Sequence, residues 1–393
     1  LWRREIPGRG WSSPVVWGNR VFVTTVENSG TSEEPKKGLY FGGNRAKPLA
    51  SIHEWKVICL DLSTGKILWK KVVKKGVPKT GLHLKNSYAS ETPVTDGEHV
   101  YVYFGNVGVF CFTLDGKSVW SKQVEPRKTR FGWGTAASSV LHKDRIYIVN
   151  DNDDGSYLLA LDKKTGETVW RTDRPRDVYD NIDPKFFYFA KAYVTPIIVE
   201  VDGKPQLVSN GSQVVNGYDP YTGEEIWRVV YDDDNTIARV VYGQGLFFVN
   251  CGGLPSRARL LAIREGGSGD VTDSHVVWDI KEGVGLEPSP VLADDLLYMV
   301  SESGVLTCLD AKTGEAVWSN RLRGKFGSSL VYGAGRVYLT TDKGLTTVVE
   351  HGRTYRVLAE NDLGEERSWA SMAVAGDSLL IRGATHLYRI QEQ

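Results

Sequence analysis

Residues 59–69 read CLDLSTGKILW, and close copies of this phrase return along the chain. The copies are ALDKKTGETVW from residue 160, GYDPYTGEEIW from residue 217, CLDAKTGEAVW from residue 308 and, more loosely, CFTLDGKSVW from residue 111. In each copy an alternating apolar run leads into a polar turn that ends in glycine, and a second alternating run follows. Two short alternating runs joined by such a turn are typical of a β-hairpin. The phrase therefore predicts a repeated hairpin.

A second hairpin pattern precedes most of the copies. Examples are SSPVVWGNRVFVTT at 12–25, TPVTDGEHVYVYF at 92–104 and SSLVYGAGRVYLTT at 328–341. Together the two hairpins make a unit of four antiparallel strands in about 40 to 55 residues, which is the spacing of a β-propeller blade. A helical repeat is disfavoured because no window holds apolar residues at i, i+3, i+4 and i+7 across several turns.

Seven such units follow one another, and an eighth is split between the two ends of the chain. The seven cover residues 11–73, 88–124, 133–173, 193–231, 238–281, 286–322 and 326–363. The stretch SWASMAVAGDSLLIRGATHLYRI at 368–390 supplies three further strands, and LWRREI at 1–6 resembles the fourth strand of the other units. We predict an all-β fold, an eight-bladed β-propeller of four-stranded antiparallel blades in which the N-terminal strand closes the last blade. Seven blades is the alternative.

The repeated tryptophans have a structural interpretation. They begin the fourth strand of most units, and buried aromatic rings are common anchors between repeats. We expect each ring to be buried between neighbouring blades; the residues are Trp2, Trp69, Trp120, Trp170, Trp227, Trp278 and Trp318. The four cysteines are expected to be free thiols: Cys59, Cys111 and Cys308 occupy a small-residue position of the repeat in different blades, and Cys251 is expected in a loop.

Composition excludes several classes of partner. The chain has 393 residues, with 48 basic and 48 acidic side chains dispersed along it, so nucleic acid is not an expected partner. No apolar run reaches the ~20 residues of a membrane span. The acidic runs at 151–155 and 232–235 lack the spacing of a calcium loop and are interpreted as turns, so no metal site is predicted. We expect a monomer.

Two insertions interrupt the pattern. Residues 27–54 separate the second and third strands of the first unit, and residues 174–191 connect the third unit to the fourth. Long loops in compact domains are usually functional or disordered. The chain begins within a predicted strand, so we expect a leader to have been removed and no signal peptide to be present.

The sequence resembles the PQQ-like β-propeller repeat family, the quinoprotein alcohol dehydrogenase-like and BamB-like group. The repeated phrase is similar to the tryptophan-docking motif of that family. Four further stretches resemble its planctomycete-type members: KNSYASETPVTDGEHVYVYFG at 85–105, GTAASSVLHKDRIYIVND at 134–151, LLAIREGGSGD at 260–270 and LLIRGATHLYRI at 379–390. The resemblance covers the whole chain. It implies one propeller domain over residues 1–393 and a periplasmic or extracellular location.

The same resemblance bears on cofactors. Quinoprotein dehydrogenases of this family carry adjacent cysteines above the quinone and Glu, Asn and Asp around a calcium ion. In this chain no two cysteines are adjacent, and no such acidic and amide set can be matched position by position. The leading prediction is a non-catalytic binding or scaffold propeller, without a cofactor, that presents one channel mouth to a protein or carbohydrate partner. The alternative is an enzyme, either a degenerate PQQ-dependent dehydrogenase with calcium or a polysaccharide-active propeller.

The candidate ligand-binding residues lie just before the innermost strands. Aromatic residues recur there, and charged residues near them break the repeat, which is where sites are expected. Aromatic faces at a channel mouth suit sugar rings, planar ligands or an extended peptide, whereas the structural alternative is that these rings plug the channel or pack between blades. The predicted set is Trp11, Tyr88, Glu91, Arg130, Trp133, Tyr193, Arg239, Glu287, Lys325 and Trp369. No catalytic residue is predicted.

Overall fold

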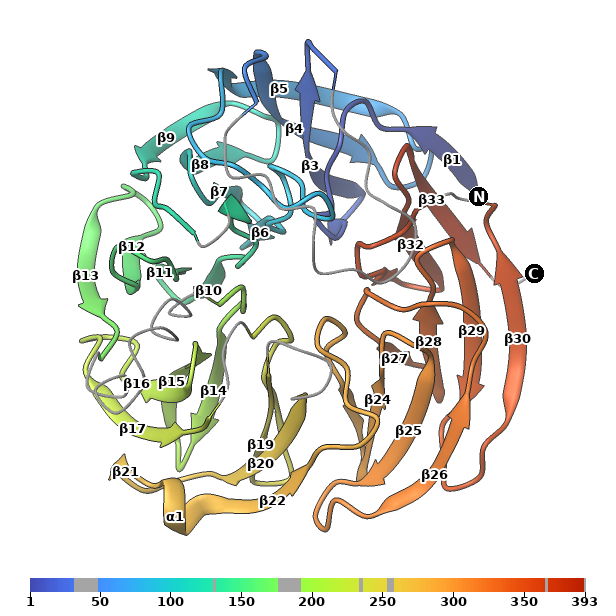
Figure 1. The fold of residues 1–393 in the computed structure, drawn as a ribbon. Coiled ribbons are helices and arrows are strands. Elements are labelled where there is room, and N and C mark those ends of the chain that lie inside the picture. Colours follow the sequence, from blue (N-terminus) through green and yellow to red (C-terminus); the bar gives the residue numbers. More distant parts are fainter. Residues whose placement is uncertain are drawn as a thin grey trace. The chain divides into compact units, whose positions relative to one another are not determined.

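A computed structural model describes residues 1–31, 49–129, 132–175, 192–232, 236–252, 258–364 and 367–391. It contains eight sheets built from strands that follow one another along the chain (Figure 1). The chain divides into two compact units, the first made of residues 1–154, 159–169 and 367–393, the second of residues 155–158 and 170–366. Residues 32–48 of the first predicted insertion and 176–191 of the second lie outside the described residues. That residues 1–393 form one domain stays a prediction.

The first unit holds blades 1 and 2, blade 8 and most of blade 3. Blade 1 consists of β2 (Val15–Trp17), β3 (Arg20–Asn28), β4 (His53–Asp61) and β5 (Ile67–Gly76). Blade 2 consists of β6 (Val94–Thr95), β7 (His99–Phe104), β8 (Gly108–Thr113) and β9 (Ser118–Gln123). Blade 3 consists of β10 (Val140–His142), β11 (Arg145–Asn150), β12 (Tyr157–Asp162) and β13 (Thr168–Asp173).

The second unit holds blades 4 to 7. Blade 4 consists of β14 (Ile197–Val201), β15 (Lys204–Asn210), β16 (Val214–Tyr218) and β17 (Glu225–Val230), and blade 5 of β18 (Val241–Gly243), β19 (Leu246–Cys251), β20 (Arg259–Arg264) and β22 (Val276–Ile280). Blade 6 consists of β23 (Val291–Ala293), β24 (Leu296–Val300), β25 (Val305–Asp310) and β26 (Ala316–Arg321). Blade 7 consists of β27 (Val331–Gly333), β28 (Arg336–Thr340), β29 (Leu345–Glu350) and β30 (Val357–Asp362).

Blade 8 joins the two ends of the chain. It consists of β31 (Ala373–Ala375), β32 (Ser378–Arg382), β33 (His386–Gln391) and the N-terminal β1 (Trp2–Glu5), in which Trp2 pairs with Arg389 and Glu5 with His386. The N-terminal strand therefore completes the last blade, as the sequence predicts, and the fold class is an eight-bladed β-propeller. The buried side chains Ile6, Val21, Leu380 and Leu387 form the apolar layer between blades 8 and 1.

The repeated tryptophans dock on the next blade, but their predicted burial is confirmed only for Trp170 and Trp227; the other five rings are half-buried. Each indole Nε1 donates to a backbone oxygen in the turn of the following blade, at 2.7 to 3.1 Å. The pairs are Trp2 with Leu62, Trp69 with Leu114, Trp120 with Lys163, Trp170 with Pro220, Trp278 with Ala311 and Trp318 with Gly352. The Trp120 ring, for example, lies so close to the turn glycine of blade 3 that a Cβ at Gly166 would be 2.4 Å from the ring. Glycine at this position is required by both space and its positive φ.

The turn that receives the indole is held by its aspartate. The Asp61 carboxylate accepts hydrogen bonds from the Thr64 backbone N and hydroxyl, at 2.7 and 2.8 Å. Asp162, Asp219 and Asp310 accept the equivalent backbone bonds in their blades. These hydrogen bonds explain why the phrase has the order Asp, two residues, Thr, Gly: the aspartate builds a turn in which glycine takes the left-handed position.

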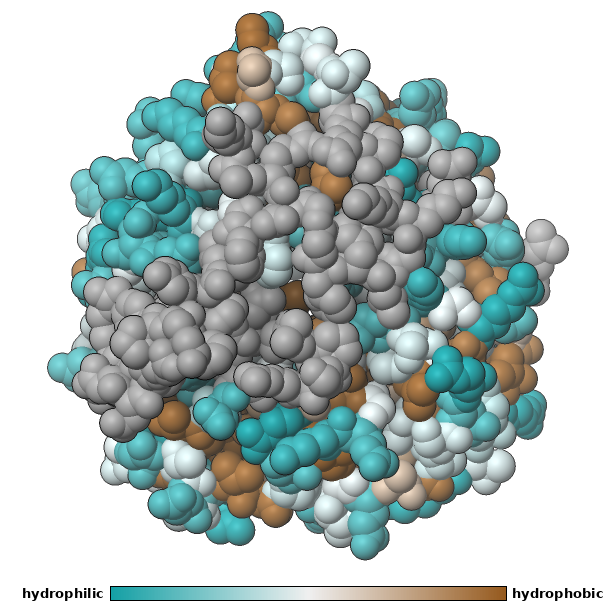
Figure 2. Space-filling model, viewed as in Figure 1, coloured by the Kyte–Doolittle hydropathy of each residue, from teal (hydrophilic) through white to brown (hydrophobic). Residues whose placement is uncertain are grey.

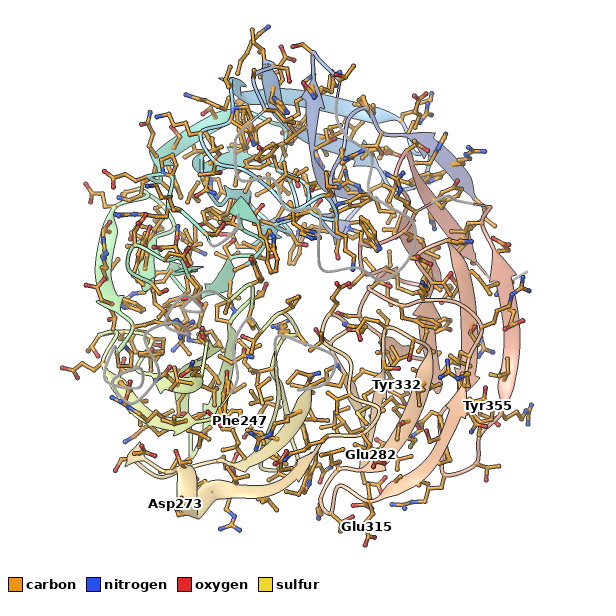
Figure 3. The ribbon with its side chains drawn as sticks, in the orientation of Figure 1. Phe247, Asp273, Glu282, Glu315, Tyr332 and Tyr355 are labelled. Atoms are coloured by element: carbon orange, nitrogen blue, oxygen red, sulfur yellow. The ribbon has the colours of Figure 1, made fainter. Side chains whose placement is uncertain are left out.

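Trp227 is an exception, and its environment explains why. Blade 5 has no such turn, so the Trp227 Nε1 donates to Gln206 Oε1 within its own blade, at 2.8 Å. The ring is 1% exposed and packs against Phe247 of blade 5 at 5.2 Å between centroids (Figure 3). In place of the turn, the two-residue β21 (Gly269–Asp270) pairs parallel to β17, and the short helix α1 (Thr272–His275) follows it. Residues 269–270, which the sequence pattern places in blade 5, thus belong to the sheet of blade 4.

Blade 1 has longer strands than the other blades. β3 and β4 have nine residues each and β5 has ten, whereas the outer strands of the other blades have four to six. The extension lies on either side of the insertion that the sequence places at 27–54. At its base the buried Lys56 ammonium contacts the carboxylates of Glu27 and Glu54, at 2.6 and 2.8 Å. The insertion therefore lengthens a hairpin, and β5 lengthens with it.

All four cysteines are free thiols in buried positions, as predicted. Burial raises the pKa of Cys59 and of Cys111 to about 12, so both stay protonated. The expectation that Cys251 lies in a loop is wrong, because it is the last residue of β19.

Candidate functional site

A pocket of about 380 Å³ lies in the first unit, within the size range of ligand sites. Three segments enclose it: the end of β5 with the linker that follows, the β7–β8 turn, and the end of β9 with its linker. Trp55 and Phe104 lie at 3% and 1% exposure, so the interior is aromatic and mostly withdrawn from solvent. The other apolar residues lining it are Val73, Val77, Pro78, Leu82, Tyr88, Val107, Phe110, Val124 and Pro126.

The linker wall of the pocket is held by Tyr88 and Thr80. The Tyr88 hydroxyl donates to the Thr80 carbonyl at 2.8 Å, and the Asn106 Nδ2 donates to the Thr80 hydroxyl at 3.0 Å. The Tyr88 ring meets His53 and Trp55 edge to face, at 5.4 and 6.0 Å between centroids. Tyr88, predicted as a mouth residue, therefore lies in the wall between blades 1 and 2.

Asn86 holds the opposite wall in place. Its Nδ2 donates to the carbonyls of Trp133 and Thr135, at 3.1 and 3.0 Å, and its Oδ1 accepts from the Ser90 hydroxyl at 2.5 Å. The Oδ1 also accepts from the Ser87 backbone N at 2.7 Å, so all four hydrogen-bonding directions of the amide are used. One side chain thus connects the linker before blade 2 to the linker before blade 3, and the pocket is preformed.

A buried carboxyl group lies directly behind the pocket. Glu91 is 2% exposed, and its Oε1 accepts from the Gly105 backbone N at 3.1 Å and from the Thr135 hydroxyl at 2.8 Å. Both Gly105 and Thr135 line the pocket. Burial raises the pKa of Glu91 to about 7, against the lowering effect of these hydrogen bonds. Glu91 therefore fixes the pocket wall from inside, and its charge changes near neutral pH.

The rim of the pocket is basic. Lys74, Lys79 and Lys122 line it, together with a single acid, Glu125. Within the described residues these three lysines enter no ion pair at 4.0 Å or less, while Lys75 nearby contacts Glu54 at 2.9 Å. Apolar side chains next to three lysines without ion-pair partners among the residues described favour a ligand that carries both a hydrophobic group and negative charge.

The other predicted residues of the first unit lie between blades. Trp11 is 8% exposed and meets Trp369 edge to face, at 5.0 Å between centroids. Trp133 meets the ring of His83 at 5.3 Å and at a steep angle. Arg130 lies outside the described residues. The structure therefore brings Trp11 together with Trp369, and groups Tyr88 and Glu91 around the pocket.

In the second unit the predicted residues begin successive blades. Tyr193 and Arg239 donate their backbone N to the Thr236 carbonyl and the Ser289 hydroxyl, at 2.8 and 2.9 Å. The Arg239 side chain is exposed, whereas Glu287 and Lys325 are half-buried. The Glu287 backbone N donates to the Glu302 carboxylate at 2.8 Å. Their role as ligand-binding residues stays a prediction.

Sequence reasoning missed a buried arginine in blade 8. Arg382 is 2% exposed, and its Nη1 donates to the Ser12 hydroxyl at 2.7 Å and carbonyl at 3.2 Å. Burial lowers the pKa of Arg382 to about 9. A signal was available, since Arg382 occupies the end of a second strand where other blades have Asn150, Asn210 or Thr340. Arg382 links blade 8 to the start of blade 1.

Hydroxyl links between blades were missed as well. The backbone N of Ser13 donates to Thr92 Oγ1, and that of Thr92 donates to Ser138 Oγ, at 3.0 and 2.8 Å. In the second unit the Ser289 backbone N donates in the same way to Ser329 Oγ, at 3.1 Å. A Ser or Thr recurs at this position of the repeat because its hydroxyl satisfies the neighbouring blade's inner backbone.

A calcium-bound quinone needs a cluster of ligating side chains and, in the family resembled, a pair of adjacent cysteines. In the described ranges no three His, Cys, Asp or Glu side chains come together in a way that could hold a metal ion. The cysteines lie singly in β4, β8, β19 and β25. The described donor set does not match the one the resemblance implies, and no reaction step is derived through that cofactor. Among the same residues, no helix has the length and apolar character needed to cross a membrane.

The chain is similar in sequence to two outer membrane assembly factors. The outer membrane protein assembly factor BamB of Burkholderia pseudomallei is 27% identical over 204 residues, which cover 45% of this chain and 49% of that protein. BamB of Alkalilimnicola ehrlichii is 29% identical over 167 residues, 42% of this chain and 33% of that protein. The matched stretches thus span half or less of these relatives.

Solved structures share the fold. BamB from Moraxella catarrhalis superposes with a TM-score of 0.62 at 11% identity, covering 100% of this chain and 99% of that one. Quinohemoprotein alcohol dehydrogenase from Comamonas testosteroni gives 0.65 at 13% identity, covering 99% and 75%. The family described as outer membrane protein assembly factor BamB matches residues 49–183, 154–278 and 211–390. Since these matches extend over most of the sequence, the chain belongs to this family of PQQ-like repeat β-propellers.

Proposed function

We propose that this chain is a non-catalytic β-propeller that binds a protein partner through the pocket of the first unit, in a periplasmic or extracellular setting. The observation that carries the proposal is the pocket itself: a preformed aromatic floor, a wall fixed by Asn86 and Glu91, and a lysine rim. Such a site binds and orients a ligand. Relatives named as outer membrane protein assembly factors make a protein the kind of partner proposed.

The predicted mouth residues have different expected roles in partner binding. Tyr88 and Glu91 belong to the pocket or its wall, so substitution there is expected to weaken partner binding. Trp11 and Trp369 pack on each other, which favours a structural contribution. A glycan array on the purified chain tests the carbohydrate alternative; specific glycan binding that is lost in Trp369→Ala would replace the protein partner in this proposal.

The experiment is affinity capture from an envelope extract with the purified chain. Phe110→Ala removes an aromatic group from the pocket, whereas Tyr332→Ala removes one from β27 in the second unit (Figure 3). A partner that is enriched by the native chain and by Tyr332→Ala, but not by Phe110→Ala, supports the proposal. Equal capture by all three proteins contradicts the site.

A parallel measurement tests the non-catalytic assignment. The chain is incubated with the quinone cofactor and calcium, and its absorbance and dye-linked alcohol oxidation are followed. One bound chromophore per chain with substrate-dependent dye reduction would overturn the assignment and favour a dehydrogenase.

A further inference from the structure

We infer that the outer edge of β5 is a docking edge for an acidic, extended peptide segment of the partner, which adds to blade 1 as a fifth strand and places an apolar side chain in the neighbouring pocket. The inference rests on the proposed function and deepens it, because it names the segment's chemistry and its mode of binding. Four independent observations support it.

The first observation is charge. Residues 66–79, KILWKKVVKKGVPK, contain six lysines and no acidic residue in a chain of zero net charge. The six are exposed: Lys66, Lys70, Lys71, Lys74, Lys75 and Lys79. In the described parts of the chain only Lys75 has an ion pair, with Glu54. Lysines on an edge strand commonly prevent edge-to-edge aggregation. The same lysines discriminate in favour of an acidic strand.

The second observation is the free backbone edge. β5 is the last strand in its sheet and pairs only with β4 among the described residues, so one side of its ten residues offers N–H and C=O groups (Figure 1). An extended peptide binds such an edge by main-chain hydrogen bonds, and its alternate side chains supply specificity. Exposed apolar residues accompany the lysines: Ile67, Leu68 and Val72 are 42%, 50% and 51% exposed.

The third observation is that this chain already adds a short strand to a blade edge. β21 pairs parallel to the outer strand β17, with Trp227 opposite Gly269 and Arg228 opposite Asp270. The Val271 backbone N then donates to the Arg228 carbonyl at 2.9 Å. Hydrogen bonds from Thr272 and the charge of Arg228 hold the pKa of Asp270 below its usual range. An acidic residue on an added strand, opposite a basic residue on the edge, is the arrangement inferred for β5.

The fourth observation is continuity with the pocket. Val73 and Lys74 belong to β5, and Val77 and Lys79 follow it; all four line the pocket. A strand that runs along β5 toward Gly76 therefore ends beside residues that line the pocket. Its last apolar side chain has a cavity of about 380 Å³ to fill. Figure 2 shows hydrophobic and hydrophilic residues side by side over the described surface of the face it presents.

An anionic lipid surface is the other target of exposed lysines and apolar residues. The peptide is favoured because a membrane makes no use of a free strand edge or of a preformed pocket at its end. The two differ experimentally, since only a strand depends on backbone N–H groups.

The probe is a fluorescein-labelled octapeptide in which Asp and Glu alternate with Val and Thr, ending in Phe. Matched peptides replace the carboxylates by amides, or a central residue by proline, which cannot continue a strand ladder. Binding is measured by fluorescence anisotropy at low and moderate salt. We expect the acidic peptide to bind with an affinity that falls as the salt concentration is raised. We expect the amide and proline peptides to bind at least about tenfold more weakly.

The variants separate the edge from general charge. Lys70→Glu combined with Lys74→Glu reverses the charge at two positions of the β5 edge. Lys164→Glu combined with Lys312→Glu makes the same change of net charge in two exposed turns of other blades. We expect at least a tenfold loss for the first pair and less than a twofold change for the second. Circular dichroism and thermal unfolding confirm that both variants are folded.

Three outcomes would overturn the inference: equal loss in both variant pairs, equal binding of the proline peptide, or no binding of the acidic peptide by the native chain. Vesicles containing phosphatidylglycerol provide a further arm, and lysine-dependent vesicle binding without peptide binding assigns the edge to a lipid surface instead. If envelope capture still depends on Phe110 while the peptide fails, the proposed function stands and this inference falls. If capture fails too, both fall.

Discussion

Glu91 shows how a single residue can depend on contacts that sequence does not display. Its partners Gly105 and Thr135 lie 14 and 44 residues away, in the next turn and the next linker. The sequence marked Glu91 as a charged residue that breaks the repeat, and predicted it at a channel mouth. In the structure the carboxyl is buried, and Gly105 allows its close approach because a Cβ there would lie 2.7 Å from Glu91 Oε1.

The raised pKa of Glu91 predicts a specific pH dependence of stability. In the unfolded chain the carboxyl loses its proton near its ordinary pKa of 4.5, whereas in the folded chain it keeps the proton up to about 7. The stabilisation is complete below pH 4.5 and is lost as pH rises from there through 7, by on the order of 3 kcal/mol. Urea unfolding at pH 5 and pH 8 should show this loss in the native chain.

Glu91→Gln keeps the size and hydrogen-bonding capacity of the side chain without a titrating group. The difference between pH 5 and pH 8 should shrink by the same amount in this variant, while other carboxylates contribute equally to both proteins. An unchanged pH difference would show that Glu91 does not carry the shift.

At the scale of elements, sequence predicts what repeats and misses what does not. The tryptophan, aspartate and glycine of the turn recur at fixed offsets, so docking of each blade on the next could be predicted. Trp227 donates to Gln206 because blade 5 lacks the turn. The sequence shows that the turn is missing, but it does not show which acceptor replaces the turn carbonyl. β21 has two residues and no pattern of its own. The lysine run at 66–79 was readable, but only the sheet order shows that it forms a free edge.

Gly166→Ala tests the docking of tryptophan on the turn glycine. The new Cβ would be 2.4 Å from the Trp120 ring, at a backbone φ of +74°. We expect a loss of about 1–3 kcal/mol from overpacking in addition to about 1 kcal/mol for the left-handed backbone. Chemical denaturation measures the sum.

Gly203→Ala is the matched control. Gly203 has a φ of +73° and nothing within 4 Å of the added Cβ, so only the backbone cost applies. Equal destabilisation of the two variants would mean that the indole does not rest on the turn.

At the scale of the whole molecule, the sequence predicted eight blades and their closure because the end strands carry the same pattern as internal ones. It could not predict a division into two compact units, which depends on contact density. The sequence names Tyr88 and Glu91 as candidate residues, and their ligand-binding role stays a prediction; the pocket beside them depends on linkers of irregular sequence.

Removal of residues 1–6 tests the closure of blade 8. The deletion takes away β1, the Trp2 bond to Leu62 and the buried Ile6 side chain. Blade 8 would be left with three strands and an unpaired outer edge on β33, so we expect a loss of several kcal/mol and a lower Tm in calorimetry. Removal of Leu1 alone, which is 66% exposed, should leave the Tm unchanged. Identical transitions for both deletions would contradict the closure.

We expect partners to bind the first unit along β5 and into the pocket beside it. Hydrogen–deuterium exchange of the chain, alone and saturated with the captured partner, tests this most directly because it reports on every segment at once. We expect slower exchange in residues 66–88, 104–110 and 121–126. Protection confined to segments of the second unit, with these three unchanged, would contradict it.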